Sequence, residues 1–464
     1  DGRRFPWTVF SDPRSSDIEQ GALGDCWLLS AMALIAERPD VLNKILLTRV
    51  YNELGVYQLR ICVDGQWRVV TVDDAFPCKK NTRTLAFAVG RKNQLWVPLV
   101  EKAYAKALGN YGKLRAGRTV EGLALLTGAP CESISLEDED LEADLIWAQL
   151  LSAKEAGYIM GASCGAGSRS RVPAGAADAL GLLTQHAYSL LDVRQEGGHR
   201  LLRVRNPRLL PSGRSESGTF WISYDDFRLY FDAVDLAKIR DHLGWAELRV
   251  PCTIGGAWAH DSIALMLVVE QPTELVASLF RGGSRTADDS DDLMICVHAV
   301  DHRGRVGELE RRSDRKPCHM ATTGDFFLRS GHYVVTILSL NSFNRGSFRM
   351  EASLVVHSNR RLFGESIACP PQMSTDSLVQ VALKEGKVQS AMLDVVPRFL
   401  TKKFGGLLVL VDNTSKSNYV HVKADCGRSS NVLSSRGALS MIDSIPPMSR
   451  QIIVVLSHFD STNA

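Results

Sequence analysis

One stretch constrains this chain more than any other: residues 20–30, which read Gln-Gly-Ala-Leu-Gly-Asp-Cys-Trp-Leu-Leu-Ser. Two glycines and an aspartate before position 26 suit a turn and a helix start, and residues 26–36 are mostly apolar helix formers. The pattern predicts a helix whose first turn carries Cys26. Unpaired backbone N–H groups and the positive end of the helix dipole favour a thiolate there, which makes Cys26 a candidate nucleophile. A small buried cysteine at the start of a core helix would give the same pattern.

Gln20 lies six residues before this cysteine. Its side-chain amide can swing toward the same point as the backbone N–H of Cys26. Together the two donors would form an oxyanion hole for a tetrahedral acyl intermediate.

A thiolate nucleophile also needs a histidine and a group that orients it, which the fold brings in from distant sequence. His186 lies in an alternating apolar segment that predicts a strand and follows a glycine-rich loop. A second predicted strand ends at Asn206, whose amide oxygen can accept the imidazole N–H and fix the tautomer. His199 lies in a predicted turn, and the other nine histidines lie beyond residue 240 without an adjacent nucleophile. We therefore expect Cys26, His186 and Asn206 to meet.

Local patterns predict several further elements. The segments 57–63 and 67–72 alternate around Asp64-Gly65, which indicates a β-hairpin. Residues 96–108 predict an amphipathic helix that ends at Gly109. From Val250 onward, repeated short strands separated by polar turns predict a β-sandwich, and further strands near the end of the chain predict a second β module.

Bulk properties exclude some classes of protein. The 464 residues predict two to four domains, and a net charge of +2 from 54 basic and 52 acidic residues gives no pull toward nucleic acid or membrane. Ten cysteines without a C-x-x-C pair fit reduced thiols in a cytoplasmic compartment. No apolar run approaches the roughly 18 residues that a membrane helix needs. The chain begins at Asp1 without methionine, and we expect it to be the C-terminal part of a longer protein.

Four segments, in this order, resemble the core of the calpain cysteine proteases: 20–29, 99–106 (Leu-Val-Glu-Lys-Ala-Tyr-Ala-Lys), 181–189 (which contains His-Ala-Tyr-Ser) and 205–207 (Arg-Asn-Pro). The resemblance covers residues 5–250. Three segments of the tail are similar to the small-optic-lobes (SOL) type of unconventional calpain, which lacks EF-hands: 419–422, 431–437 and 443–447.

The resemblance implies an α+β chain with a two-lobed papain-like core followed by C-terminal β-sandwich modules. We expect five parts: a Cys lobe at 1–116, a His/Asn lobe at 117–249, a C2-like sandwich at 250–358, a linker at 359–375 and a SOL-type β module at 376–464. The implied function is an intracellular cysteine endopeptidase that makes limited cuts with Cys26, His186, Asn206 and the oxyanion residue Gln20. Its partners would be protein substrates, with weak membrane or protein contacts through the C2-like part.

The sequence also departs from the calpain pattern. Arg208 and Leu209 stand where the family has tryptophan and glycine, and that tryptophan shields the Asn–His hydrogen bond from water. Only residues 208–217 separate Asn-Pro from the next recognisable motif, a shorter segment than in the family. These departures favour an alternative function, a catalytically weak scaffold. Acyl transfer of the transglutaminase kind is a third reading, which the calpain-like motif order opposes.

Calcium aligns the lobes of many calpains, and here its expected ligands are altered. Asp17 matches a family ligand, and Phe10 and Asp12 occupy positions whose backbone carbonyls would contribute. Gln94 replaces a glutamate, and Ser217 and Thr219 replace an acidic pair in the second lobe. Since calcium requires several oxygens, carboxylates above all, we expect weak or no calcium activation through the core.

Overall fold

A computed structural model describes residues 7–82, 84–136, 142–165, 177, 182–184, 186–206, 218–240, 243–256, 262–283, 291–342, 348–389 and 393–458. The chain divides into two compact units, residues 1–240 and 241–464. Helices and strands mix in the first unit and strands dominate the second, so the expected α+β class is confirmed.

The first unit contains six helices in its described part: α1 (Cys26–Ala36), α2 (Pro39–Ile45), α3 (Trp96–Leu108), α4 (Thr119–Thr127), α5 (Ala143–Glu155) and α7 (Tyr224–Tyr230). Its short 3-10 helices are η1 (Ser15–Asp17), η2 (Arg91–Asn93) and η3 (Tyr111–Leu114). Its strands are β1 (Ile18–Glu19), β2 (Val56–Val63), β3 (Gln66–Asp73), β4 (Val89–Gly90), β5 (Cys131–Ser135), β6 (Ile159–Cys164), β7 (His186–Glu196), β8 (His199–Arg205), β9 (Thr219–Ser223) and β10 (Ala233–Ala237).

Helix α1 is the centre of the helical part of this unit. All of its residues after Cys26 are buried, which is why the helix is apolar on every side. Helix α4 packs closely on it, because a Cβ at Gly122 would come within 2.8 Å of the Ala31 Cβ. Although residues from 117 onward were expected in the second lobe, α4 thus lies against the helix that begins at Cys26.

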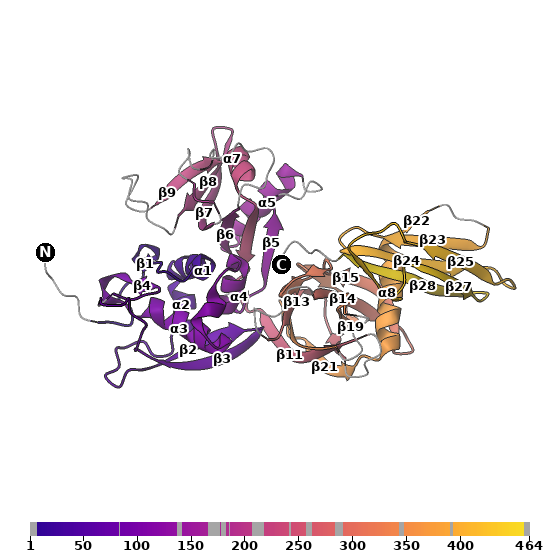
Figure 1. Ribbon diagram of the computed structural model, residues 1–464, viewed down its shortest axis with the longest axis horizontal. Helices are drawn as coiled ribbons and strands as arrows, with labels where there is room; N and C mark the ends of the chain where they lie inside the picture. The colour runs from indigo at the N-terminus through magenta and orange to yellow at the C-terminus, as the bar shows by residue number, and fades with distance from the viewer. Residues whose placement is uncertain are drawn as a thin grey trace. The chain divides into compact units, whose positions relative to one another are not determined.

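The rest of the unit is an antiparallel six-stranded sheet in the order β5-β10-β6-β7-β8-β9. Figure 1 shows α5 and α7 beside this sheet, while α1 to α4 gather near the β2–β3 hairpin. Helix α5 buries Ile146, Trp147, Leu150 and Ala153, a helical spacing that places its apolar face in the core of the sheet. His186 is the first residue of β7, and Asn206 directly follows β8. The sheet therefore brings two of the expected site residues together at one end of these neighbouring strands.

The second unit begins with a sandwich of two antiparallel sheets. One has the order β11-β20-β13-β17, with β18 also on β13, and the other has the order β15-β14-β19-β12-β21, with β16 on β14. The strands are β11 (Ala246–Gly255), β12 (Ile263–Val269), β13 (Thr273–Arg281), β14 (Asp292–Val300), β15 (Val306–Arg312), β16 (Lys316–Pro317), β17 (Met320–Thr322), β18 (Phe326–Leu328), β19 (Gly331–Leu338), β20 (Arg349–Ser358) and β21 (Phe363–Ala368). Inward-facing residues of both sheets form one core, as the alternating sequence pattern predicts.

A β module follows helix α8 (Pro371–Glu385). Its strands are β22 (Lys387–Val388), β23 (Val395–Leu400), β24 (Gly406–Asn413), β25 (Val420–Asp425), β26 (Val432–Ser434), β27 (Ser440–Ile445) and β28 (Ser449–His458). They form a sheet of order β22-β23-β24-β28-β26 and the separate pair β25-β27. Helix α8 lies between the sandwich and these strands (Figure 1), and its Leu378 and Val381 share one apolar cluster with residues of both.

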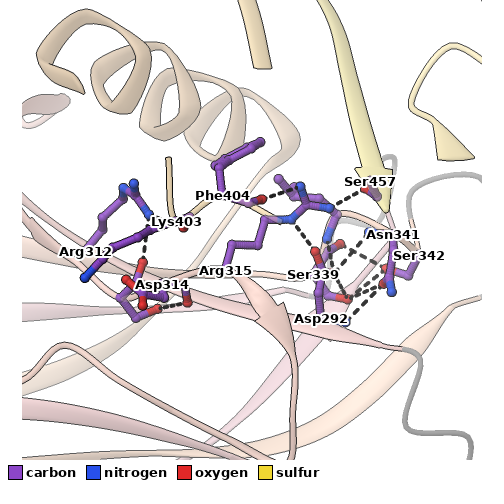
Figure 2. Close-up of polar contacts among 12 residues, drawn as sticks. Asp292, Arg312, Asp314, Arg315, Ser339, Asn341, Ser342, Lys403, Phe404 and Ser457 are labelled. Carbon is purple, nitrogen blue, oxygen red and sulfur yellow. Dashed lines mark hydrogen bonds and ion pairs between the residues drawn. The ribbon is translucent and has the colours of Figure 1, made fainter. Parts of the chain in front are cut away.

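A buried arginine of the sandwich also contacts the β module (Figure 2). The guanidinium of Arg315 pairs with Asp292 of β14, and it also donates to the Phe404 carbonyl (3.0 Å) and to the Ser457 hydroxyl. Asp292 in turn accepts from the backbone N–H groups of residues 340 and 341. These contacts hold the two β parts of the second unit together.

The expected internal boundaries need revision. Residues 246–249, expected in the His/Asn lobe, belong to β11, which pairs with β20 of the sandwich. The expected linker at 359–375 instead contains β21, which pairs with β12, and the first turn of α8. Pro370 and Pro371 suggested a break, but Pro370 caps α8 and Pro371 is its first residue, where a missing N–H costs nothing.

Candidate active site

Cys26 is the first residue of α1, as the sequence predicts. Asp25 caps the helix, and its carbonyl accepts from the N–H groups of residues 28 and 29. Trp27 fixes the start of the helix, because its indole N–H donates to the Leu114 carbonyl at 2.8 Å and its ring meets Tyr104 edge-on. The thiol of Cys26 is partly exposed, and the backbone N–H of Ala187 lies close enough to lower its pKa. The nucleophile candidate therefore lies against the residue that follows His186.

His186 and Asn206 meet at one end of the neighbouring strands β7 and β8. The His186 Nε2 lies 3.1 Å from the Asn206 Oδ1, so an Nε2–H donated to this oxygen leaves Nδ1 as the basic nitrogen. The backbone N–H of Asn206 donates to the Gly218 carbonyl, and a Cβ at Gly218 would come within 2.8 Å of the backbone carbonyl oxygen of Asn206. Gly218 also has φ +62, so both the lack of space and the backbone conformation favour a glycine at this position.

The Asn206 side chain is well protected from water. Asn206 is 7% exposed, and the His186 ring packs edge-on against Tyr188 with the centroids 5.4 Å apart. The sequence predicted an exposed pair because Arg208 replaces a shielding tryptophan. Asn206 is buried, and Arg208 lies outside the described residues.

The pKa of the Cys26 thiol differs from the expected direction. Burial raises this pKa, and the carboxylate of the neighbouring Asp25 raises it further, while the surrounding backbone N–H groups lower it less. The start of a helix alone would favour a thiolate, but desolvation and a negative neighbour outweigh it here. The thiol therefore needs a base to remove its proton.

Gln20 follows strand β1, which pairs with β4. Its position is fixed by the next residue: a Cβ at Gly21 would lie 2.3 Å from the Phe87 carbonyl oxygen, so the two backbones touch. The Ala22 N–H also donates to the Ala86 carbonyl. The Gln20 side chain is exposed and lines a cavity of about 350 Å³ together with Trp7 and Phe87.

Comparison with known proteins adds to this geometry. Residues 5–209 match the family model described as calpain family cysteine protease. Residues 5–209 are therefore similar to the calpain protease domain. Residues 381–464 match a second model, described as the calpain-D-like C-terminal domain, which coincides with most of the β module.

Relatives of this calpain domain occur in plants and animals. The calpain-type cysteine protease DEK1 of Arabidopsis thaliana is 36% identical over 282 residues, which cover 54% of this chain and 12% of the relative. The calpain-type cysteine protease ADL1 of Oryza sativa is 36% identical over 48% of this chain and 11% of its own length. Calpain-9 of Mus musculus is 29% identical over 56% of this chain and 42% of its own length. The chain thus spans a small part of the plant relatives that it matches.

The first unit contains a buried acidic pair that sequence reasoning missed. Asp25 and Glu101 are 0% and 1% exposed, and each carboxyl group affects the pKa of the other. Both oxygens of Glu101 also accept from the Ala88 N–H at 3.2 Å. Burial, together with the carboxylate of Asp25, raises the pKa of Glu101 to about 9, so the pair holds one proton at neutral pH. The sequence feature that could have indicated this pair is an acidic residue on the apolar face of the 96–108 helix.

A second missed feature is an ion pair between Arg205 and Glu37. Arg205, the last residue of β8, donates to the Glu37 carboxylate at 2.7 Å and to the Ala33 carbonyl at 3.3 Å, both in or just after α1. Burial would raise the pKa of Glu37, but the hydrogen bond and charge of Arg205 lower it below its usual range. The residue before Asn206 is thereby tied to the helix of Cys26.

The residues expected to hold calcium do not fit the ion. Asp12 is exposed and its carboxylate pairs with Arg14 at 2.7 Å. Both oxygens of Asp17 are occupied by donors, which are described below. Thr219 lies in β9 opposite Arg205, and Ser217 lies outside the described residues. Within the described ranges, no three acidic, histidine or cysteine side chains gather as metal ligands.

No helix in the part of the chain that the structure describes has the length and apolar character needed to span a bilayer. The ten cysteines carry thiols rather than disulfides.

Proposed function

We propose that this chain is a cysteine endopeptidase that makes limited cuts in protein substrates, with Cys26 as nucleophile, His186 as base, Asn206 as the orienting residue and Gln20 in the oxyanion hole. The observation that carries the proposal is the hydrogen bond between His186 Nε2 and Asn206 Oδ1. The effect of the neighbouring Ala187 N–H on the pKa of Cys26 supports a place for the thiol beside this pair, as thiol proteases require.

In the proposed reaction, His186 Nδ1 takes the proton of Cys26 as the sulfur attacks a peptide carbonyl carbon. The negative oxygen of the tetrahedral intermediate is held by the Gln20 amide and the Cys26 N–H. The imidazolium then protonates the leaving amine as the C–N bond breaks, which leaves an acyl-enzyme. Water, deprotonated by His186, attacks the thioester and regenerates the thiol.

Because the pKa of Cys26 is raised, removal of its proton depends on His186. A buried thiol next to Asp25 carries little thiolate by itself, so proton removal depends on the imidazole at each turnover. Reactivity at Cys26 should therefore fall sharply when the imidazole is absent. This dependence distinguishes an assembled site from an ordinary reactive cysteine.

The proposal extends to cellular context. Ten thiols without disulfides suit the reducing cytoplasm. The match of residues 381–464 to the calpain-D-like C-terminal domain supports assignment to the SOL type of calpain. The sandwich that precedes this domain is a candidate for weak protein or membrane contacts. The cavity beside Gln20, lined by Trp7 and Phe87, can receive an apolar side chain of a substrate.

Labelling by an epoxide inhibitor of cysteine proteases tests the proposal. The purified chain is treated with the epoxide and the modified cysteines are located by mass spectrometry, with Cys78 as an internal reference because it is an exposed thiol. We expect Cys26 to react much faster than Cys78, and we expect His186→Ala to abolish the difference. Labelling of Cys26 at the rate of Cys78 would reject the protease function and favour a binding scaffold.

A further inference from the structure

Beside Gln20, a lysine and a glutamine hold the carboxylate of Asp17, at the position where the calpain pattern expects calcium. We propose that Lys92 and Gln94 replace the metal: they fix Asp17, and through it Gln20, so that the oxyanion side of the site is assembled without calcium. The inference rests on the proposed function for its catalytic meaning. Its structural part can be measured independently.

Asp17 is 3% exposed, and hydrogen-bond donors surround its carboxylate. One oxygen, Oδ2, accepts from the Gln94 Nε2 at 2.9 Å and from the Arg14 backbone N–H at 3.1 Å. The other oxygen, Oδ1, lies 3.5 Å from the Lys92 Nζ. A buried carboxylate needs such partners, and the protein supplies all of them.

Gln94 has the chemistry that this position requires. It is 1% exposed, its amide nitrogen donates to Asp17, and its amide oxygen accepts from the Ser11 N–H at 3.1 Å. A glutamate could accept from Ser11 but could not donate to Asp17 unless it were protonated. The glutamine therefore joins the segment before Asp17 to Asp17 itself, which is the bridging task of a metal ion.

The backbone at Lys92 supports a role for its side chain. Lys92 has φ 57 and ψ 32, and Asn93 has φ 57, so two successive residues lie in the left-handed region. Glycine is the residue best suited to this conformation, and a lysine there is strained. Its side chain is 47% exposed, and its ammonium reaches the nearly buried Asp17. The contact gives a physical reason for a lysine at a strained position.

A short path leads from Asp17 to Gln20. Asp17 ends η1, and β1 (Ile18–Glu19) follows directly and pairs with β4. Arg91, next to Lys92, pairs with Glu19 at 2.5 Å. The residues 91–94 therefore hold the 17–19 segment through three side chains, and Gln20 is the next residue along the chain.

Charge explains why calcium is not needed here. Asp17 contributes one negative charge, which the ammonium of Lys92 neutralises. A calcium ion would meet this ammonium and would find a single carboxylate, whereas tight calcium sites use several. Replacing both residues reverses the situation, because Lys92→Met removes the cation and Gln94→Glu adds a carboxylate.

The test uses the full chain in EDTA and in millimolar CaCl₂. Four variants are compared with the parent: Lys92→Met, Lys92→Arg, the double variant Lys92→Met/Gln94→Glu, and Lys416→Met as an exposed control in the other unit. Three quantities are measured: the rate of epoxide labelling of Cys26, calcium binding by calorimetry, and hydrogen exchange of the 8–20 segment.

We expect the parent, Lys92→Arg and Lys416→Met to be labelled equally fast with and without calcium and to release no calcium-binding heat. We expect Lys92→Met to expose the 8–20 segment to faster exchange and to lower the labelling rate roughly tenfold in EDTA, since a buried carboxylate loses its cation. The double variant should bind calcium, and calcium should restore both its labelling rate and its protection from exchange.

Three results would overturn the inference: a parent chain that requires calcium, a Lys92→Met variant with unchanged exchange in the 8–20 segment, or a double variant that calcium does not restore. If Cys26 of the parent is labelled in neither condition, the proposed protease function fails instead. In that case calorimetry and hydrogen exchange still decide whether Lys92 and Gln94 replace the metal.

Discussion

Replacement of Glu101 by glutamine is expected to stabilise the first unit at neutral pH and to remove much of the pH dependence of its stability. The Glu101 carboxyl is buried beside that of Asp25, and it accepts a hydrogen bond from the Ala88 N–H. A glutamine has nearly the same shape. Its amide oxygen can accept from Ala88 and its amide nitrogen can donate to the Asp25 carboxylate, so both contacts survive the change.

The magnitude follows from the pKa. The folded chain holds the Glu101 proton up to about pH 9, whereas an unfolded chain releases it near 4.5. Between these values the unfolded state binds fewer protons, so the free energy of unfolding falls by about 1.4 kcal/mol per pH unit. The contribution is complete below pH 4.5 and is lost as pH rises toward 9. From pH 5 to pH 8 the loss is on the order of 4 kcal/mol, and Glu101→Gln should not show it.

The assay is urea unfolding of the full chain at pH 5 to 8, followed by pulsed hydrogen exchange of the α3 peptide, so that unfolding of the first unit is read separately from the second. Glu53→Gln, in an exposed turn, is the matched control and should keep the parent's pH dependence. We expect Glu101→Gln to be more stable than the parent at pH 7 by about 3 kcal/mol. Equal pH slopes in the variant and the parent would refute the shared-proton explanation.

Three further predictions concern other buried charges. Arg205→Met removes the ion pair with Glu37 and should slow epoxide labelling of Cys26 by roughly three- to tenfold, because β8 loses its contact with α1. The circular dichroism spectrum should not change, and an unchanged labelling rate would contradict the prediction. Arg315→Met should destabilise the second unit by about 3–5 kcal/mol in urea because Asp292 stays buried without its cation, and a second change of Asp292 to asparagine should recover much of the loss. Burial lowers the pKa of His298 to about 4, so the unfolded chain binds more protons than the folded chain between pH 6.5 and 4. As pH falls through this range, the free energy of unfolding of the second unit should decrease by about 3 kcal/mol. A His298→Gln variant with the same acid sensitivity would exclude His298 as the cause.

Elements governed by local sequence could be predicted closely. The helix expected at 26–36 is α1, with the same bounds, and the helix expected at 96–108 is α3, which ends at Gly109 with φ +106. The hairpin around Asp64-Gly65 also forms, with both turn residues at positive φ. In each case turn residues and apolar periodicity lie within a few residues of the element that they specify.

Features that depend on distant contacts could not be predicted in the same way. Glu101 lies 76 positions after Asp25 in the sequence, and nothing local shows that the two carboxyl groups share one buried space. The direction of the Cys26 pKa was mistaken for the same reason, since helix position can be read locally and desolvation cannot. The expected linker at 359–375 failed because prolines mark helix starts as well as breaks, and strand β21 becomes visible only through its pairing with β12.

Two buried carboxylates lie on either side of the segment that carries Gln20. Asp17, three residues before Gln20, is neutralised by Lys92, and Asp25, five residues after it, shares a proton with Glu101. Each of these pairs joins the 17–26 segment to the 86–101 region, once through η2 and once through α3. A loop that must present an amide and a backbone N–H to one oxygen atom gains from being fixed at both ends, because oxyanion stabilisation depends on donors that are already in place. In the proposed arrangement the chain does this with its own cation and its own proton, so the metal independence and the pH-sensitive stability that we predict have one structural origin.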